Sequence, residues 1–331
     1  MAHLTNPLAT VDQLYQRTSF SALPSDLQDI IFFTIQCLTQ AAGVLLRLPQ
    51  SVTAQACVIL ARHWLIDSPL SHGFSDTSAA ALYLVAKLSS HPCPPRDLCN
   101  VYAYLLSRSS PLLRDPSLDE TKDKDKERER EEYYLSETAY TTLRSRILTL
   151  EARILYTISF NTHVALPHPL AITYLQALDF LSFPRAEISG RAIAYLNTAL
   201  LSPQLLYLTQ QPSALAVAAI YAAARDLGAH LPDCAWWEVF DVDREDLGFL
   251  VVAMRSLEGW ARKLEGDGKR WLKKGMITRK DVEAEMRNRG LMIGNGSGSA
   301  SGEAQDEEDD LMRQMDEKAA ELEEDEFAIN H

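Results

Sequence analysis

The sequence lacks the features of several common functional classes. Its five cysteines form no C-x-x-C pair and have no histidine at zinc-ligand spacing, and their odd number excludes a complete disulfide framework. The N-terminal residues show no basic segment followed by an apolar one, so no signal peptide is indicated. The longest apolar run, residues 214–224, is well short of the ~20 residues that a membrane helix needs. We therefore expect a soluble protein of a reducing intracellular compartment, with no membrane association and no metal.

Motifs that carry catalysis or hold a cofactor are also missing. The glycine-rich residues 294–302 fit neither the G-x-G-x-x-G spacing of nucleotide-binding loops nor the G-x-S-x-G spacing of a nucleophile elbow, and we interpret them as a linker. His163 and His168 lie on either side of Pro167, which breaks the helix that would align them, so a metal site there is disfavoured. The sequence predicts neither an enzyme nor a bound cofactor.

Signals for β-strands are absent too, since no segment shows a two-residue alternation or a high density of Val, Ile and Thr. Proline, glycine and charged residues instead divide the chain into helical blocks, so the predicted fold class is all-α. We expect helices over residues 25–46, 52–67, 77–88, 96–106, 137–158, 170–181, 186–201, 213–227 and 243–264.

Two of these blocks are apolar on all sides and resemble each other. Residues 80–87 (AALYLVAK) match residues 218–225 (AAIYAAAR) at a constant separation of 138 residues, and His and Pro follow each segment within a few residues. A helix that is apolar on every side is enclosed by other helices, and alanine lets their backbones approach closely. The match indicates an internal repeat; the alternative is that two alanine-rich helices look alike by composition alone.

The formal net charge of −13 is concentrated at one end of the chain. Residues 303–331 hold 13 of the 45 acidic residues and 2 of the 32 Lys and Arg residues, so the rest of the chain is almost neutral. Binding of nucleic acid by the whole chain would need clustered Lys and Arg to neutralise phosphates. The charge distribution therefore argues against a direct nucleic-acid partner and predicts a disordered acidic tail.

Two other segments have a strongly biased composition. Residues 119–132 contain no apolar side chain, and they predict an exposed charged insertion. Residues 269–280 contain six bases and no acid, which fits either a nuclear import signal or a solvated helical extension.

The repeat and the segments around it resemble the cyclin family, and in particular its L-type members. The resemblance covers about residues 25–265, and L-type cyclins carry a charged insertion at the same place. The segments that carry it are residues 40–50, 79–87, 95–101, 150–160, 163–170 and 174–178. No single segment is specific, but their combination and order are.

This resemblance implies two tandem cyclin boxes, each a repeat of five helices. The first box would span residues 25–162, with the charged insertion at roughly 107–135, and the second would span residues 163–265. The other expected regions are an N-terminal extension (1–24), the basic segment with the Gly/Ser linker (266–302) and the acidic tail (303–331).

The function that the resemblance implies is a non-catalytic subunit that binds and activates a cyclin-dependent kinase. Such a subunit packs against the C helix of the kinase, which seats the glutamate that pairs with the catalytic lysine and frees the activation loop. Members of this group serve RNA polymerase II transcription and pre-mRNA processing, which implies a nuclear location.

Lys87 and Glu151 match the lysine and glutamate through which cyclins contact the kinase. The residue types at these positions also fit purely structural roles. Lys87 at a helix end complements the helix dipole, and Glu151 with Arg153 would fit a solvated helix face. We expect the apolar residues around Glu151 to belong to the core; they are Leu148, Ile154, Leu155 and Ile158.

The sequence departs from the L-type pattern in two places. Leu88 and Ser89 follow Lys87, where these cyclins usually have two glutamates, so two negative charges are missing from a region near the expected kinase contact. The chain also shows an acidic tail where L-type cyclins often have one rich in Arg and Ser. The alternative function is a transcription-factor-like adaptor that binds DNA or polymerase, although such factors usually bring an N-terminal zinc ribbon and a basic face.

Overall fold

The computed structural model describes residues 4–19, 21, 23–107, 134–181, 187–267 and 277–291. All regular structure in these residues is helical, which confirms the predicted all-α class. Most of the predicted insertion (108–133), most of the basic segment, the Gly/Ser linker and the acidic tail lie outside the described residues. The chain divides into two compact units, Met1–Val282 and Glu283–His331.

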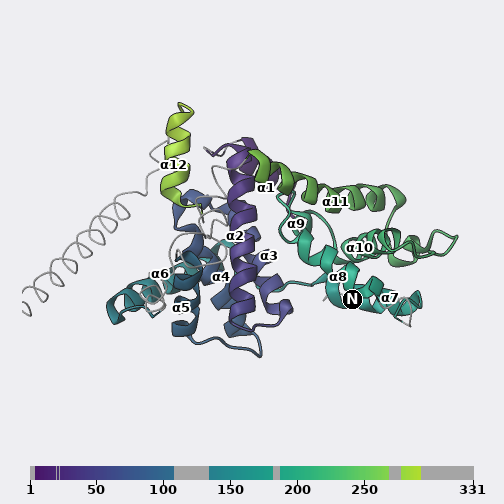
Figure 1. Ribbon diagram of the computed structural model, residues 1–331, viewed down its shortest axis with the longest axis horizontal. Helices are drawn as coiled ribbons and strands as arrows, with labels where there is room; N and C mark the ends of the chain where they lie inside the picture. The colour runs from purple at the N-terminus through teal and green to yellow at the C-terminus, as the bar shows by residue number, and fades with distance from the viewer. Residues whose placement is uncertain are drawn as a thin grey trace, which may run out of the picture. The chain divides into compact units, whose positions relative to one another are not determined.

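Nine of the described helices lie within a few residues of the nine predicted ones; Figure 1 labels these helices and colours them by their position along the chain. The helices are α1 (Val11–Ser19), α2 (Ser25–Leu45), α3 (Gln50–Ile66), η2 (Pro69–Ser71), α4 (Phe74–Leu88), α5 (Pro95–Leu106), α6 (Glu137–Thr157), α7 (Pro167–Ala177), α8 (Glu187–Ala199), α9 (Leu206–Thr209), α10 (Pro212–Asp226), η5 (Trp236–Phe240), α11 (Arg244–Asp267) and α12 (Arg279–Asn288).

The helix α1 was not predicted, because it has only nine residues, although Val11, Leu14 and Tyr15 lie on one side of it. Its start is fixed by a reciprocal cap: the backbone N–H of Gln13 donates to Thr10 Oγ1 at 3.2 Å, and the N–H of Thr10 donates to Gln13 Oε1 at 3.0 Å. Such a capping box satisfies two backbone donors that a helix end would leave unpaired. The T-x-x-Q pattern was therefore the sequence signal for this helix.

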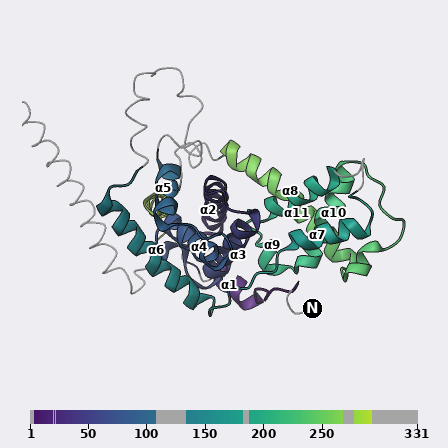
Figure 2. The ribbon, with the colours of Figure 1, turned by 90° about the horizontal axis from the view of Figure 1, so that it is seen from below.

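The first helical group consists of α2–α6, and α4 lies at its centre. This helix packs against α2, α3, α5 and α6, and Figure 2 shows it among them. Residues Ala79, Ala80 and Ala81 are at most 1% exposed. Their small side chains let the neighbouring helices approach from every side, as the all-round apolar pattern predicted.

A chain of buried hydroxyl groups fastens α4 to α2 and α5. The oxygens of Ser78 and Tyr102 are 2.7 Å apart, and so are those of Ser78 and Thr39. Because Thr39 donates to the carbonyl of Ile35 at 2.8 Å, Ser78 donates to Thr39 and Tyr102 donates to Ser78. The hydroxyl hydrogens of Thr39, Ser78 and Tyr102 therefore all have an acceptor, which the burial of these groups requires.

The second helical group consists of α7–α11 with η5, and α10 takes the central place. It packs against α7, α8, α11 and η5, and residues 215–220 are at most 1% exposed. The two matching sequence segments thus form the central helices of the two groups. The match extends to side chains: Lys87 lies 5.7 Å from the ring of Tyr83, and Arg225 lies 5.9 Å from the ring of Tyr221. The division into two cyclin boxes at residue 162 stays a prediction.

The described residues of the second unit, 283–291, include the C-terminal end of α12. Gly290 has a positive φ of 69°, and the N–H of Leu291 donates to the carbonyl of Met286 at 3.0 Å. This is the usual way in which a glycine terminates a helix.

Candidate functional site

Lys87 lies in the last turn of α4, and the local sequence explains why the helix stops there. Ser89 is extended, and its N–H bonds to the carbonyls of Val85 and Ala86, which closes the final turn. Its hydroxyl also donates to Ala86 at 2.9 Å. The Lys87 side chain remains 56% exposed at this helix end.

Glu151 comes from the inner face of α6. Ile147, Leu150 and Ile154 share that face and are at most 4% exposed. Glu151 itself is 7% exposed, so the suggestion that it lies on a solvated face is wrong. A carboxylate this well shielded from water needs a partner to offset its desolvation.

Lys87 is that partner. Its ammonium nitrogen donates to Glu151 Oε1 at 3.1 Å, and the hydrogen bond and charge of Glu151 raise the pKa of Lys87. The pair joins residues that are 64 positions apart in the chain. The two predicted site residues are therefore brought together, with the cation facing solvent and the carboxylate held beneath it. Lys87 is also the basic residue of the last turn of α4, so it complements the helix dipole as well.

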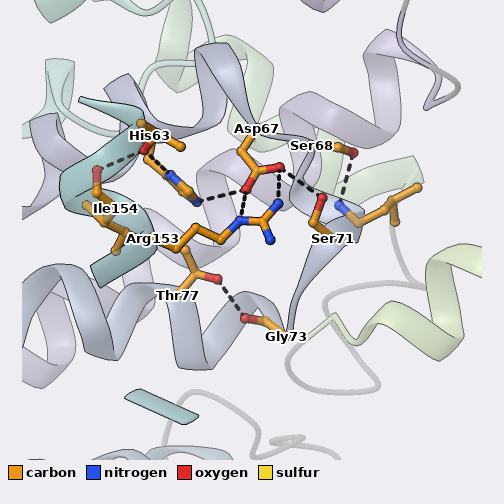
Figure 3. A network of polar contacts seen from close by, with 10 residues as sticks. His63, Asp67, Ser68, Ser71, Gly73, Thr77, Arg153 and Ile154 are labelled. Atoms are coloured by element: carbon orange, nitrogen blue, oxygen red, sulfur yellow. Dashed lines mark hydrogen bonds and ion pairs between the residues drawn. The ribbon is translucent and has the colours of Figure 1, made fainter. Parts of the chain in front are cut away.

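A polar network braces α6 against the end of α3, two residues beyond Glu151 (Figure 3). Arg153 donates twice to Asp67, from Nε at 2.6 Å and from Nη2 at 3.1 Å. Ser71 donates to Asp67 at 3.0 Å, and His63 Nε2 lies 3.7 Å from the same carboxylate. Burial alone would raise the pKa of Asp67, but the hydrogen bonds from Arg153 and Ser71 lower it. The network holds α6 in place and so fixes where Glu151 lies.

Apolar side chains lie beside the Lys87–Glu151 pair and are open to solvent. Leu88 is 61% exposed at the end of α4, and Leu148, one turn before Glu151, is 36% exposed. The prediction that Leu148 belongs to the core is therefore wrong; Ile154 and Ile158 are buried as predicted, and Leu155 is half-buried. Leu148 faces outward because α6 turns only one side toward α4. It also lines a small surface depression, with Tyr83 and residues of α5.

No metal centre is formed within the described ranges, where no three His, Cys, Asp or Glu side chains gather suitably. His168 instead hydrogen-bonds Asn197 at 2.9 Å, and the backbone carbonyl of His163 accepts from Arg62 at 2.7 Å. None of the described helices is long and apolar enough to cross a bilayer.

A second charged cluster was missed by the sequence analysis. Asp226, the last residue of α10, accepts hydrogen bonds from Arg191, Tyr195 and Arg255. The internal repeat could have indicated this cluster. Its separation of 138 residues aligns Asp226 with Leu88, which follows the predicted contact residue Lys87. Its partners lie on other helices, and the sequence alone does not indicate them.

Several curated proteins are similar to this chain. Cyclin-L2 of Homo sapiens is 30% identical over 264 residues, which cover 78% of this chain and 45% of that protein. Cyclin-L1 of Gallus gallus is 27% identical over 283 residues, which cover 85% of this chain and 46% of that protein. An uncharacterised cyclin-L1-like protein of Schizosaccharomyces pombe is 29% identical over 217 residues, 66% of this chain and 78% of that one. The chain thus spans less than half the length of the first two relatives.

Solved structures share the fold at low sequence identity. A chain of the yeast RNA Pol II CTD kinase CTDK-1 complex has a TM-score of 0.59 at 14% identity, covering 87% of this chain and 84% of that chain. A chain of the CAK complex of Chaetomium thermophilum, bound to ATP-gamma-S, has a TM-score of 0.50 at 15% identity, covering 81% and 80%. No protein-family model matches the chain.

Proposed function

The chain belongs to the cyclin family and is similar to its L-type members, and from this we propose that it is the regulatory subunit of a cyclin-dependent protein kinase. The kinase would act in the nucleus, in RNA polymerase II transcription, pre-mRNA processing or both. The subunit contributes no catalytic group. Its role is to hold a rigid surface against the kinase.

The observation that carries this proposal is the surface around Lys87 and Glu151. It combines an ion pair whose cation is half exposed with the exposed apolar side chains of Leu88 and Leu148. Contact surfaces between proteins commonly have such apolar groups beside a charged anchor. The C helix of a kinase would pack on α4 and α6 there, which seats the glutamate that pairs with the catalytic lysine.

The Lys87–Glu151 ion pair suits a rigid contact with the kinase. Glu151 fixes the Lys87 ammonium group by one hydrogen bond, and a lysine has two further hydrogens to donate. Backbone carbonyls or a carboxylate of the kinase are acceptors that these hydrogens fit. Because Lys87 is already held by Glu151, little side-chain entropy is lost when the kinase binds.

Leu88 would help to select the kinase. It stands where L-type cyclins usually have the first of two glutamates, and its side chain is 61% exposed. An exposed leucine favours an apolar patch on the kinase, whereas a glutamate favours a basic one. We therefore expect the partner to lack the basic residues that would meet an acidic pair.

The proposal is tested by purifying the tagged full chain from its native cell and identifying the kinase that co-purifies. The purified complex is then assayed on the recombinant C-terminal repeat domain of RNA polymerase II. We expect activity that disappears when the tagged chain is depleted. A chain that co-purifies with no protein kinase contradicts the proposal, and salt-dependent binding of DNA by the purified chain would favour the adaptor instead.

We predict that Lys87→Ala lowers kinase activation about tenfold or more, because the anchor of the contact is lost. Glu151→Gln keeps the side-chain volume but removes the charge that holds Lys87, so it should act in the same direction. Recovery of the kinase with the tagged chain and phosphorylation of the repeat domain are the measurements.

The matched control is Arg96→Ala. Arg96 forms another ion pair with α6, to Glu137 at 2.7 Å, and both side chains are exposed. An exposed pair of this kind contributes little to folding, because water screens it. We expect activation to survive this change. If Lys87→Ala leaves activation intact, or if Arg96→Ala lowers it equally, the contact assignment is wrong.

A further inference from the structure

The cluster around Asp226 joins three helices of the second helical group through one carboxylate. Tyr195 donates its hydroxyl to Oδ2 at 2.5 Å, and Arg191 donates to Oδ2 from Nη2 at 2.9 Å and from Nε at 3.1 Å. Arg255 donates to Oδ1 from the other side. The Asp226 side chain is 14% exposed, so its charge is directed at these donors rather than at bulk water.

The cluster contains more positive charge than the carboxylate needs. One arginine would neutralise Asp226, but two are present, and their side chains are 53% and 50% exposed. Arg225, the neighbour of Asp226 in α10, is exposed as well. Arg225 lies over the ring of Tyr221, so two arginines hold the one carboxylate. A further acid on α11, Glu258, is engaged by Arg262 at 2.5 Å.

Asp226 also holds the side chains of Arg191 and Arg255 in fixed positions, which favours binding of a ligand. A guanidinium group has five N–H donors, and Asp226 uses two of Arg191 and one of Arg255. The remaining donors belong to side chains whose position is already fixed, so binding an anion would cost little further entropy. An arginine pair held in this way is suited to groups with several acceptor oxygens.

Exposed apolar side chains continue the surface along α11. Val252, three residues before Arg255, is 69% exposed, and Phe249, three residues earlier again, is 59% exposed. Positions three residues apart share one side of a helix. Gly259, one turn after Arg255, is also exposed, and a Cβ added there would meet no atom within 4 Å. Nothing inside the fold requires a glycine here, and glycine is a poor helix former.

We propose that Arg191, Arg255 and the outer side of α11 form a docking surface for a phosphorylated segment of a partner protein. The phosphate ester of a phosphoserine binds the arginine pair, and apolar residues of the same segment contact Val252 and Phe249. The glycine at position 259 leaves room for the main chain of the segment to approach the helix.

Phosphate fits this surface better than a second carboxylate does. Asp226 already occupies the carboxylate position between the arginines, and the donors that remain belong to two side chains that are half exposed. A phosphoserine carries a charge of about −1.5 to −2 and three acceptor oxygens, so it can accept hydrogen bonds from both arginines at once. Recognition of phosphorylated segments by arginine clusters is a common mode of peptide binding.

The test uses the purified full chain and two fluorescein-labelled peptide libraries. Each library has seven residues with a fixed central serine and mixed flanking positions; in one of them the serine is phosphorylated. Fluorescence anisotropy should show saturable binding of the phosphorylated library, and binding at least about tenfold weaker for the other. Equal binding of the two libraries, or binding of neither, overturns the proposal.

Arg255→Ala should weaken binding of the phosphorylated library about tenfold, while Asp226 keeps Arg191 and Tyr195 as partners and the chain stays folded. Lys263→Ala is the matched control, since Lys263 is an exposed base on the same helix. We expect it to change the affinity less than about twofold. If Arg255→Ala has no effect, or if the control weakens binding as much, the site assignment is wrong.

The variant Gly259→Gln tests peptide binding separately from the stability of the fold. Glutamine is a better helix former than glycine, so the variant should unfold at a higher urea concentration than the wild type. Its side chain should nevertheless weaken peptide binding, because it occupies the space beside Arg255. Unchanged binding contradicts the placement of the peptide on α11. The assay contains no kinase, so its failure would leave the kinase-binding proposal intact.

Discussion

At the residue scale, burial keeps the imidazole of His63 neutral although a carboxylate lies beside it. It is 2% exposed, and its Nδ1 lies 2.7 Å from the hydroxyl oxygen of Thr157. Because that hydroxyl donates to the carbonyl of Ile154 at 2.8 Å, the imidazole donates to it from Nδ1. Burial lowers the pKa of His63 to about 4, with Arg153 and His72 acting in the same direction and Asp67 opposing them.

We predict that His63 makes the fold less stable as the pH falls from 6.5 to 4. Above pH 6.5 the histidine is neutral in both the folded and the unfolded chain, so it has no effect. Between the two values the unfolded chain takes up a proton that the folded chain does not. The expected loss is on the order of 3 kcal/mol, and it levels off below about pH 4.

The measurement compares urea unfolding of the wild type and His63→Asn from pH 7.5 to 4. Asparagine keeps an N–H near the position of Nδ1 but does not titrate. Asp29, whose pKa is raised to about 6 by burial, acts in the opposite direction in this range, and the comparison cancels its contribution. If the difference between wild type and His63→Asn does not change with pH, the assignment fails.

At the scale of helices, Gly43 explains why α2 and α3 pack so closely. A Cβ added to Gly43 would lie 2.7 Å from Thr53 Cγ2 and 3.1 Å from Thr53 Cβ, and it would collide with the threonine hydroxyl as well. Thr53 is 2% exposed and cannot swing into solvent. Gly43 belongs to one of the segments that resemble L-type cyclins, and its contact with Thr53 gives the physical reason for a glycine there.

We predict that Gly43→Ala destabilises the fold by about 1–3 kcal/mol through this overlap, even though alanine favours helices. Thr53→Ala removes the colliding atoms, so the double variant should be more stable than the two single changes predict when added. The measurement is a double-mutant cycle by urea unfolding. Additive effects would mean that the two helices can move apart without cost.

At the scale of the whole first unit, the N-terminal segment ties the two helical groups together. The Asn6 side chain forms two hydrogen bonds with the backbone of Ala165, both at 2.8 Å, in the connection between α6 and α7. The Gln211 side chain at the start of α10 in turn bonds the backbone N–H and carbonyl of Asn6, both at 3.1 Å. Arg62 of α3 donates to Asn6 Oδ1 at 3.4 Å. Residues 1–24 were predicted only as an extension, yet Asn6 is 6% exposed.

We predict that Asn6→Ala destabilises the fold by about 1–3 kcal/mol, because the buried N–H and carbonyl of Ala165 lose their partners. Hydrogen exchange at the Ala165 amide should speed up about tenfold or more. Thr18→Ala is the control, since Thr18 is exposed and bonds only within α1. Unchanged protection of Ala165 would show that the segment does not hold the connection.

The sequence by itself determined the helices, because helix formation depends on nearby residues. Prolines, caps and the spacing of apolar residues predicted α2–α8, α10 and α11, and the all-apolar segments predicted the two central helices. Where the helix was short, as in α1 and α9, no helix was predicted. Lys87 could be placed at a helix end for the same local reason.

Only the tertiary structure decided which distant side chains meet. Glu151 is buried against Lys87 because α6 crosses the end of α4, and no local pattern in the sequence contains that crossing. The partners of Asp226 and the contacts of Asn6 depend in the same way on how helices and connections pack. Such contacts join residues from about 30 to more than 200 positions apart, so their chemistry follows from packing geometry rather than from spacing along the chain.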